Sequence, residues 1–180
     1  MATYDKFPEV AVEGYDDCAW QGWDAIVREL THRAGQYTRT VLVIDCYPGV
    51  RLEELETKLL PALGATLTLN AEQMRLDEPA LSRLLARHLT DDRVFGVLSC
   101  HQLDEFIDPV KREALQAQVE RCREGIIVIY GPGAALVNAG DILVYADLPR
   151  WEIQQRMRSG ELANWGAANQ NEDILRRYKR

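Results

Sequence analysis

Long apolar runs are missing from this chain of 180 residues. A helix that crosses a membrane needs about 20 consecutive, mostly apolar residues, and no stretch approaches that length. The first eight residues include Asp5 and Lys6 and contain no apolar core of the kind that an export signal requires. We therefore expect no membrane partner and a cytoplasmic location.

Metal-binding patterns are missing as well. The four cysteines lie far apart and form no CxxC pair, which argues against a zinc knuckle or a thioredoxin-type site. The three histidines share no spacing that a metal motif would need. We expect no metal in this chain and reduced cysteines, with Cys46 and Cys100 buried in or beside strands.

An excess of basic residues is also absent. The chain has 21 Lys and Arg against 28 Asp and Glu, a net charge of −7, whereas nucleic-acid-binding domains are usually basic. The charge is uneven, because residues 150–180 carry a net +3 and residues 1–149 a net −10. The composition therefore argues against a nucleic-acid partner and sets a basic C-terminal region apart.

Short apolar runs alternate with helical patterns along the chain. Uninterrupted β-branched runs are typical of strands buried on both faces of a parallel sheet. The predicted strands are residues 40–45, 65–69, 94–98, 126–130 and 141–146. The predicted helices are residues 20–33, 52–63, 78–89, 108–123, 149–157 and 173–179. Residues 131–138 are predicted as a short turn and helix, and residues 9–12 are a further strand candidate.

This alternation predicts one α/β domain, a three-layer sandwich around a mostly parallel five-stranded sheet. Residues 1–148 would form the sheet core and residues 149–180 a lid-like helical tail. Five strands is the size of a nucleotide-binding domain. In such sheets ligands bind outside the carboxyl ends of the strands, so the loops there are the candidate sites.

The first such loop, DCYPGVRL, stands where a P-loop kinase has GxxxxGK[ST]. Of that motif only Gly49 remains, and the lysine and the hydroxyl are missing. Arg51 is a candidate substitute for the lysine, although Glu53 and Glu54 follow it and would repel a phosphate. The loop is either an ordinary strand-to-helix turn or an altered phosphate site.

Two further loops leave alternatives open. In the GPG turn, Gly131 and Gly133 could expose backbone N–H groups to an anion, or could serve only a tight turn. The segment 100–108 gathers one histidine and three carboxylates, among which Asp104 is a candidate base or magnesium ligand. That segment could equally be a solvated acidic loop in which Asp108 caps the next helix.

The basic tail supplies cations and aromatic rings. Arg150, Arg156 and Arg158 are candidate phosphate ligands, because guanidinium groups bind phosphate with two parallel hydrogen bonds. Trp151 and Trp165 are unusual in so polar a stretch, and their presence beside arginine favours a docking surface.

Several segments carry a family resemblance. VLVID–CYPGVRLEEL, IIVIYGPGAAL and DILVYADLPRWEIQQRMRSGE resemble the uridine-kinase-like branch of P-loop kinases, in which a late strand also leads into an arginine-bearing lid helix. FPEVAVEGYDDCAWQGWDAI, YGPGAALV and DILVYADLPRWEIQQRMRSGELANWGA, with the final DILRRYKR, are similar to the N-terminal region of bacterial class I mannose-6-phosphate isomerase family proteins. The resemblance covers nearly the whole chain, and the tail is its most specific part.

The resemblance implies a P-loop NTPase or kinase-like fold with incomplete kinase chemistry. The zinc-dependent isomerase site of those proteins would lie in a later cupin-type domain, so neither zinc nor another cofactor is expected in this chain. A sugar phosphate or nucleotide would bind at Gly49, Arg51, Gly131, Gly133 and the tail arginines. We expect a non-catalytic accessory domain that contacts its own C-terminal isomerase domain, cut from a longer protein after residue 180.

Two alternatives remain. The first is an active nucleoside or sugar kinase that uses Mg-ATP, with Arg51 in place of the lysine and Asp45 or Asp104 as base or magnesium ligand. The second is a docking or oligomerisation module without a ligand, in which Trp151 and Trp165 pack on a partner or on a second copy. The accessory-domain interpretation predicts no ATP turnover.

Overall fold

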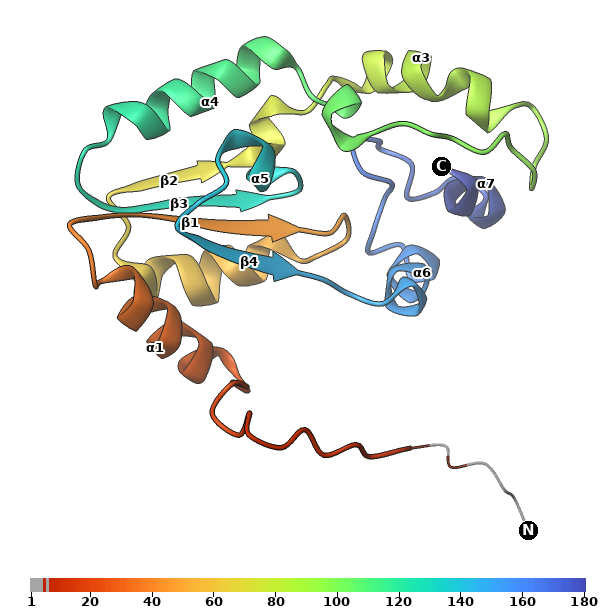
Figure 1. Ribbon diagram of the computed structural model, residues 1–180. Coiled ribbons are helices and arrows are strands. Elements are labelled where there is room, and N and C mark those ends of the chain that lie inside the picture. The colour runs from red at the N-terminus through yellow and green to blue at the C-terminus, as the bar shows by residue number, and fades with distance from the viewer. Residues whose placement is uncertain (1–4, 6) are drawn as a thin grey trace.

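A parallel sheet of four strands, in the order β2-β3-β1-β4, forms the centre of the computed structural model, which describes residues 5 and 7–180 (Figure 1). The strands are β1 (Arg39–Cys46), β2 (Leu67–Asn70), β3 (Gly125–Gly131) and β4 (Ile142–Ala146). The predicted α/β class and parallel sheet are thus confirmed.

Helices connect the strands and cover both faces of the sheet. They are α1 (Trp23–Ala34), α2 (Leu52–Glu54), α3 (Glu78–Leu89), α4 (Pro109–Arg121), α5 (Ala134–Val137), α6 (Arg150–Arg158) and α7 (Ile174–Lys179). A π-helical turn, Leu55–Leu59, and a 3₁₀ turn, Leu60–Leu63, extend α2. Asp108 caps α4 as predicted, because its side chain accepts hydrogen bonds from the N–H groups of Val110 and Lys111.

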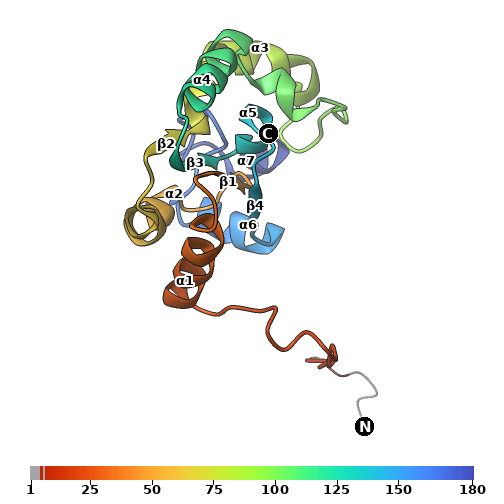
Figure 2. The same ribbon diagram turned by 60° about the vertical axis from the view of Figure 1, so that its left-hand side comes forward.

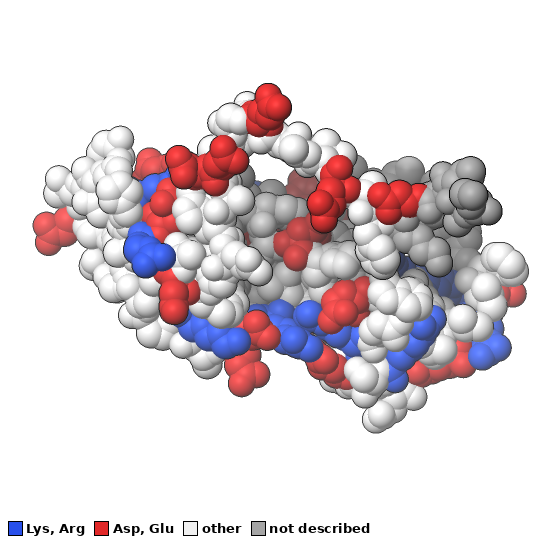
Figure 3. All heavy atoms as spheres, turned by 90° about the horizontal axis from the view of Figure 1, so that it is seen from below, with Lys and Arg blue, Asp and Glu red and all other residues white. Residues whose placement is uncertain are grey.

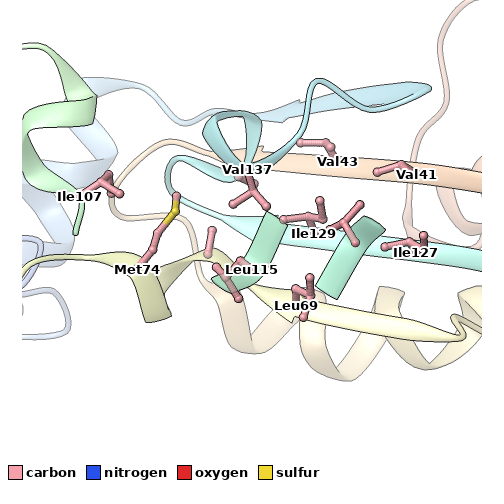
Figure 4. Packing of buried hydrophobic residues seen from close by; sticks show 12 residues of the cluster. Val41, Val43, Leu69, Met74, Ile107, Leu115, Ile127, Ile129 and Val137 are labelled. Atoms are coloured by element: carbon pink, nitrogen blue, oxygen red, sulfur yellow. The ribbon is translucent and has the colours of Figure 1, made fainter. Parts of the chain in front are cut away.

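Two apolar layers hold the helices against the sheet. On one face, α4 and α5 cover alternate side chains of β1 and β3, among them Val41, Val43, Ile127 and Ile129, all at most 2% exposed (Figure 4). On the other face, α1 and the α2 segment cover the intervening side chains of the same strands. Figures 1 and 2 show this sandwich from two sides. Both faces of β1 and β3 are buried, which explains why their sequences are apolar throughout.

The strand order places β1 and β3 side by side in the middle of the sheet. Their pairing runs from Arg39 opposite Gly125 to Asp45 opposite Gly131. The chain leaves β1 toward one edge, through β2, and leaves β3 toward the other, through β4. The loops after β1 and β3 therefore meet at the carboxyl edge of the sheet, where the direction of winding changes and ligands usually bind.

One of the five predicted strands, residues 94–98, is wrong, and the sheet has four strands. Residues 94–98 form an irregular loop between α3 and α4, with Phe95 75% and Leu98 89% exposed. The carboxylate of Asp92 accepts hydrogen bonds from the N–H groups of Val94 and Phe95, each at 2.7 Å, and so holds a turn where a strand would need to extend. Cys100, predicted to be buried, is exposed. Within the described part of the chain, residues 9–12 are also not a strand.

The C-terminal residues 149–180, here called the tail, lie beyond the carboxyl ends of the strands and next to α3 and the 90–102 loop (Figure 1). Arg93 and Asp173 join that loop to the tail through an ion pair, with Nη2 and Oδ2 separated by 2.9 Å. At the other end of the chain, residues 7–21, here called the arm, extend away from the body. Among the described residues, no helix combines the length and the apolar character needed to cross a membrane.

Candidate functional site

A cavity of about 390 Å³ lies at the carboxyl edge of the sheet. Its walls come from the loop after β1, from α3 through Leu81 and Leu85, and from the tail through Arg150 and Trp165. Cavities that bind small molecules usually range from about 300 to 1,000 Å³, so this one has room for a small ligand. Its position matches the edge at which the sequence predicts binding.

Aromatic side chains and a few polar groups line this cavity. Glu72, which follows the carboxyl end of β2, accepts a hydrogen bond from the indole N–H of Trp165 and lies 3.5 Å from the Arg75 guanidinium. The cations that line the cavity are Arg150, whose Nη2 donates to the carbonyl of Tyr178 at 3.3 Å, and Arg180. Two cations, further polar groups and an aromatic wall suit a small ligand that has an anionic group and a ring that can stack on Trp165.

Arg51, the predicted substitute for the P-loop lysine, is bound to the tail. Its Nε and Nη2 donate to the two carboxylate oxygens of Glu161 at 2.7 and 3.1 Å. This bidentate contact raises the pKa of Arg51 and lowers the pKa of Glu161. Arg51 lines a separate hollow of about 220 Å³ and not the larger cavity. Its cation is therefore used to fasten the tail to the β1 loop.

Two arginines of the tail, Arg156 and Arg158, are also engaged within the chain. Arg156 donates from Nη1 to the carbonyl of Gly49 at 2.8 Å, and its Nε contacts Glu152 at 2.8 Å. The Arg158 guanidinium lies over the rings of Trp151 and Tyr178, 5.5 and 5.7 Å from their centroids. Seen from below, basic side chains lie mainly along one margin of the molecule and alternate there with acidic ones (Figure 3).

Asp45 fills the place that an anion would take at the GPG turn. Its carboxylate, at the end of β1, accepts hydrogen bonds from the N–H groups of Gly133 at 2.9 Å and Ala135 at 3.3 Å. Gly131 and Gly133 are buried, and of this turn only Pro132 lines the large cavity. The turn serves the fold, and Asp45 has a structural role in it.

Replacing Asp45 with alanine is expected to lower the free energy of unfolding by about 1–2 kcal/mol, because two N–H groups at the start of α5 would lose their acceptor. Chemical denaturation measures the change. Asp45→Asn is the matched control, because it keeps one acceptor oxygen and should lose less. Equal losses in the two variants would contradict this role for the carboxylate.

In the segment 100–108, the contacts of His101 and Glu105 are with each other and with neighbouring residues. The Nδ1 of His101 lies 2.8 Å from the Glu105 carboxylate, and the Gln102 N–H and His101 lower the pKa of Glu105. The His101 ring packs edge-on against His88, 4.9 Å between centroids, and Asp104 is exposed. No cluster of three potential metal ligands occurs among the residues that the structure describes.

Acid is expected to loosen the tail before the sheet core. The pKa of Glu161 is lowered by Arg51 and the pKa of Asp173 by Arg93. Each contact stabilises the fold fully above the ordinary values of 4.5 and 3.8 and is lost as the pH falls through the lowered values. Proteolysis of the tail between pH 6 and pH 2 with an acid-tolerant protease would follow this loss. A Glu161→Gln variant should show a weaker pH dependence, and an unchanged profile would contradict the expectation.

Of the predicted binding residues, Gly49 and Arg150 line the large cavity, and the others do not. Sequence reasoning missed Glu72, Arg180 and the part that Trp165 plays as a wall. Glu72 lies just after the carboxyl end of β2, so the rule that selected the other loops could have found it. Trp165, predicted as an exposed docking residue, is partly buried, whereas Trp151 is 63% exposed.

One known protein family matches nearly the whole described chain. The family described as "Domain of unknown function (DUF8485)" matches residues 22–180. The chain belongs to the DUF8485 family. The matched DUF8485 region begins at the N-cap of α1 and includes every helix and strand of the fold and the residues that line the cavity. No curated protein and no solved structure matches the chain.

Proposed function

We propose that this DUF8485 domain is a non-catalytic, kinase-like accessory domain that binds a small anionic molecule, such as a sugar phosphate, in the cavity at the carboxyl edge of its sheet. The observation that carries the proposal is the bidentate contact of Arg51 with Glu161. The one cation placed like a kinase lysine is neutralised by a residue of the tail.

A kinase requires free cations and N–H groups where the phosphates bind, because its catalysis is largely positioning and electrostatic stabilisation. Here Arg51 is paired with Glu161, and the N–H of Gly133 is bound to Asp45. An ATP phosphate at this loop would have to displace two carboxylates. These contacts support a binding role over phosphoryl transfer.

The cavity supports the binding part of the proposal. Arg150 and Arg180 line it with an apolar wall that includes Leu81 and Leu85. The phosphate of a bound ligand would contact the arginines, and the rest of the molecule would pack on the wall and on Trp165. The resemblance to the N-terminal region of mannose-6-phosphate isomerase family proteins favours a sugar phosphate and an accessory role beside a cytoplasmic isomerase domain.

Calorimetry tests the binding, with mannose 6-phosphate, inorganic phosphate and Mg-ATP as separate probes. We expect heat with the sugar phosphate, a weaker response to inorganic phosphate, and loss of binding in Arg150→Ala. Arg158→Ala is the matched control, because Arg158 lies on Trp151 and Tyr178 and does not line the cavity. Heat with none of the three probes would overturn the binding role.

An ADP-release assay tests the absence of catalysis. With Mg-ATP and mannose, or with Mg-ATP and uridine, the purified chain should release no ADP above the background of the assay. Turnover that depends on the added acceptor and disappears in Arg51→Ala would overturn the proposal and favour the kinase alternative.

A further inference from the structure

We propose that the arm of one copy adds to the open edge of β4 in a second copy, as a fifth strand of the sheet. The partner is a second copy of this chain, and the contact is independent of the ligand cavity. Residues 9–12 of the arm would supply the strand that their sequence predicts.

The receiving surface is the outer edge of β4. Within the described residues, β4 pairs with β1 alone, at residues Leu42 to Cys46. An open edge leaves backbone N–H and C=O groups able to pair with another chain. On one face of this edge, Leu143 and Tyr145 are 60% and 59% exposed. The edge thus combines unpaired backbone with an uncovered apolar face.

The other face of the same edge borders an open hollow of about 440 Å³. Ile142 lines it from β4, and Glu29, His32, Arg33 and Gln36 line it from α1 and the turn that follows. These polar groups contact one another, because Arg33 pairs with Glu29 at 2.5 Å and the Gln36 amide lies 3.3 Å from the His32 ring. A strand that fits here needs apolar residues toward Leu143 and polar or small residues toward the hollow.

The arm has this alternation. Val10 and Val12 are 83% and 65% exposed and would face one side of a strand, and Glu9, Ala11 and Glu13 would face the other. The valines would then cover the apolar face of β4, and Glu9, Ala11 and Glu13 would face the polar hollow. Strand addition of this kind gains affinity from main-chain hydrogen bonds and specificity from alternate side chains.

The position of the arm in the single chain is the reason for choosing a second copy as the partner. Every residue from 7 to 22 is exposed, and both ribbon views show the arm leading away from the sheet (Figures 1 and 2). The Arg33 guanidinium lies over the Trp20 ring, 5.4 Å from its centroid, which holds the root of the arm on α1. In the single chain the arm does not pair with β4 among the described residues, and reciprocal exchange between two copies would satisfy both.

Light scattering coupled to size exclusion, over a range of concentrations, tests the dimer. We expect the full chain to form a reversible dimer that Val12→Asp weakens at least tenfold in Kd. Tyr15→Asp is the matched control, because Tyr15 is 63% exposed on the same arm but lies outside the pairing segment. A chain that stays monomeric up to about 1 mM, or a dimer that Val12→Asp leaves unchanged, would overturn the proposal.

Cross-linking tests which copy supplies the arm. One chain carries Val12→Cys and the other Leu143→Cys, both with Cys18, Cys100 and Cys122 replaced by serine. Mild oxidation should give a disulfide dimer of the two different chains. A single chain with both substitutions that closes on itself at every concentration would overturn the exchange between copies. Neither result depends on ligand binding, so the proposed function is tested separately.

Discussion

Replacing Arg177 with methionine is expected to lower the free energy of unfolding by about 3 kcal/mol and to detach part of the tail. Arg177 is 3% exposed and donates from Nη1 to the carbonyl of Gln170 at 2.8 Å and from Nη2 to the carbonyl of Leu162. Asn164 in turn donates to the carbonyl of Arg177 at 2.9 Å. Methionine is a long side chain without donors, so the carbonyl groups of Gln170 and Leu162 would lose their hydrogen-bond partner.

Arg176→Met is the control for that change, because Arg176 is the neighbouring residue on the same helix and is exposed. Denaturant unfolding gives the loss of stability, and hydrogen exchange over residues 162–172 shows where the structure opens. The variants should differ by at least 2 kcal/mol, since substitutions of exposed residues usually change stability by less than about 0.5 kcal/mol. Similar behaviour of the two variants would contradict the anchoring role of Arg177.

Replacing Gly166 with alanine is expected to lower the free energy of unfolding by about 3 kcal/mol. It should also weaken binding of the proposed ligand. Gly166 has a φ of 74°, which disfavours residues with a side chain, and an added Cβ would overlap with Arg75 and Leu81. The end of the Arg75 side chain can shift, but Leu81 is 1% exposed and has little room, so we expect the loop to move as well. Trp165 would move with it and away from Glu72, and the wall of the cavity would change.

Gly160→Ala separates the effect of backbone strain from the effect of the overlap with neighbouring side chains. Gly160 has a similar φ of 77°, but nothing lies within 4 Å of the Cβ that would be added. This variant should lose only about 1 kcal/mol, from backbone strain alone. Thermal or chemical unfolding compares the two variants, and calorimetry measures binding of the sugar phosphate. If Gly160→Ala were as destabilised as Gly166→Ala, close packing at Gly166 would not be the cause.

The sequence predicts the strands well where local pattern and burial agree. β1 and β3 are buried on both faces, so each is an unbroken apolar run that has few other interpretations. Residues 94–98 are also mostly apolar, but they begin in a turn that Asp92 caps, and in the described part of the chain they pair with no strand. A strand needs a partner in space, which composition does not report.

The candidate site is less predictable because its contacts join distant parts of the chain. The sequence identifies Arg51 as a cation in the correct loop, yet its partner Glu161 lies 110 residues further on. Asp45 likewise accepts a hydrogen bond from Gly133, which lies 88 positions further along the sequence. Such a side chain is free to bind a ligand only if no other residue of the folded chain pairs with it. The tertiary structure shows these pairings, and the sequence does not.

Two contacts join the tail to the loop after β1: the ion pair between Arg51 and Glu161 and the hydrogen bond from Arg156 to Gly49. Binding of the proposed ligand would therefore be coupled to docking of the tail. The cavity has a complete wall only while the tail is docked, so a ligand that binds it must favour the docked form. At a concentration 100 times its Kd, such a ligand adds about 2.7 kcal/mol to the stability of that form. Protection of the tail from a protease would then report occupancy of the cavity.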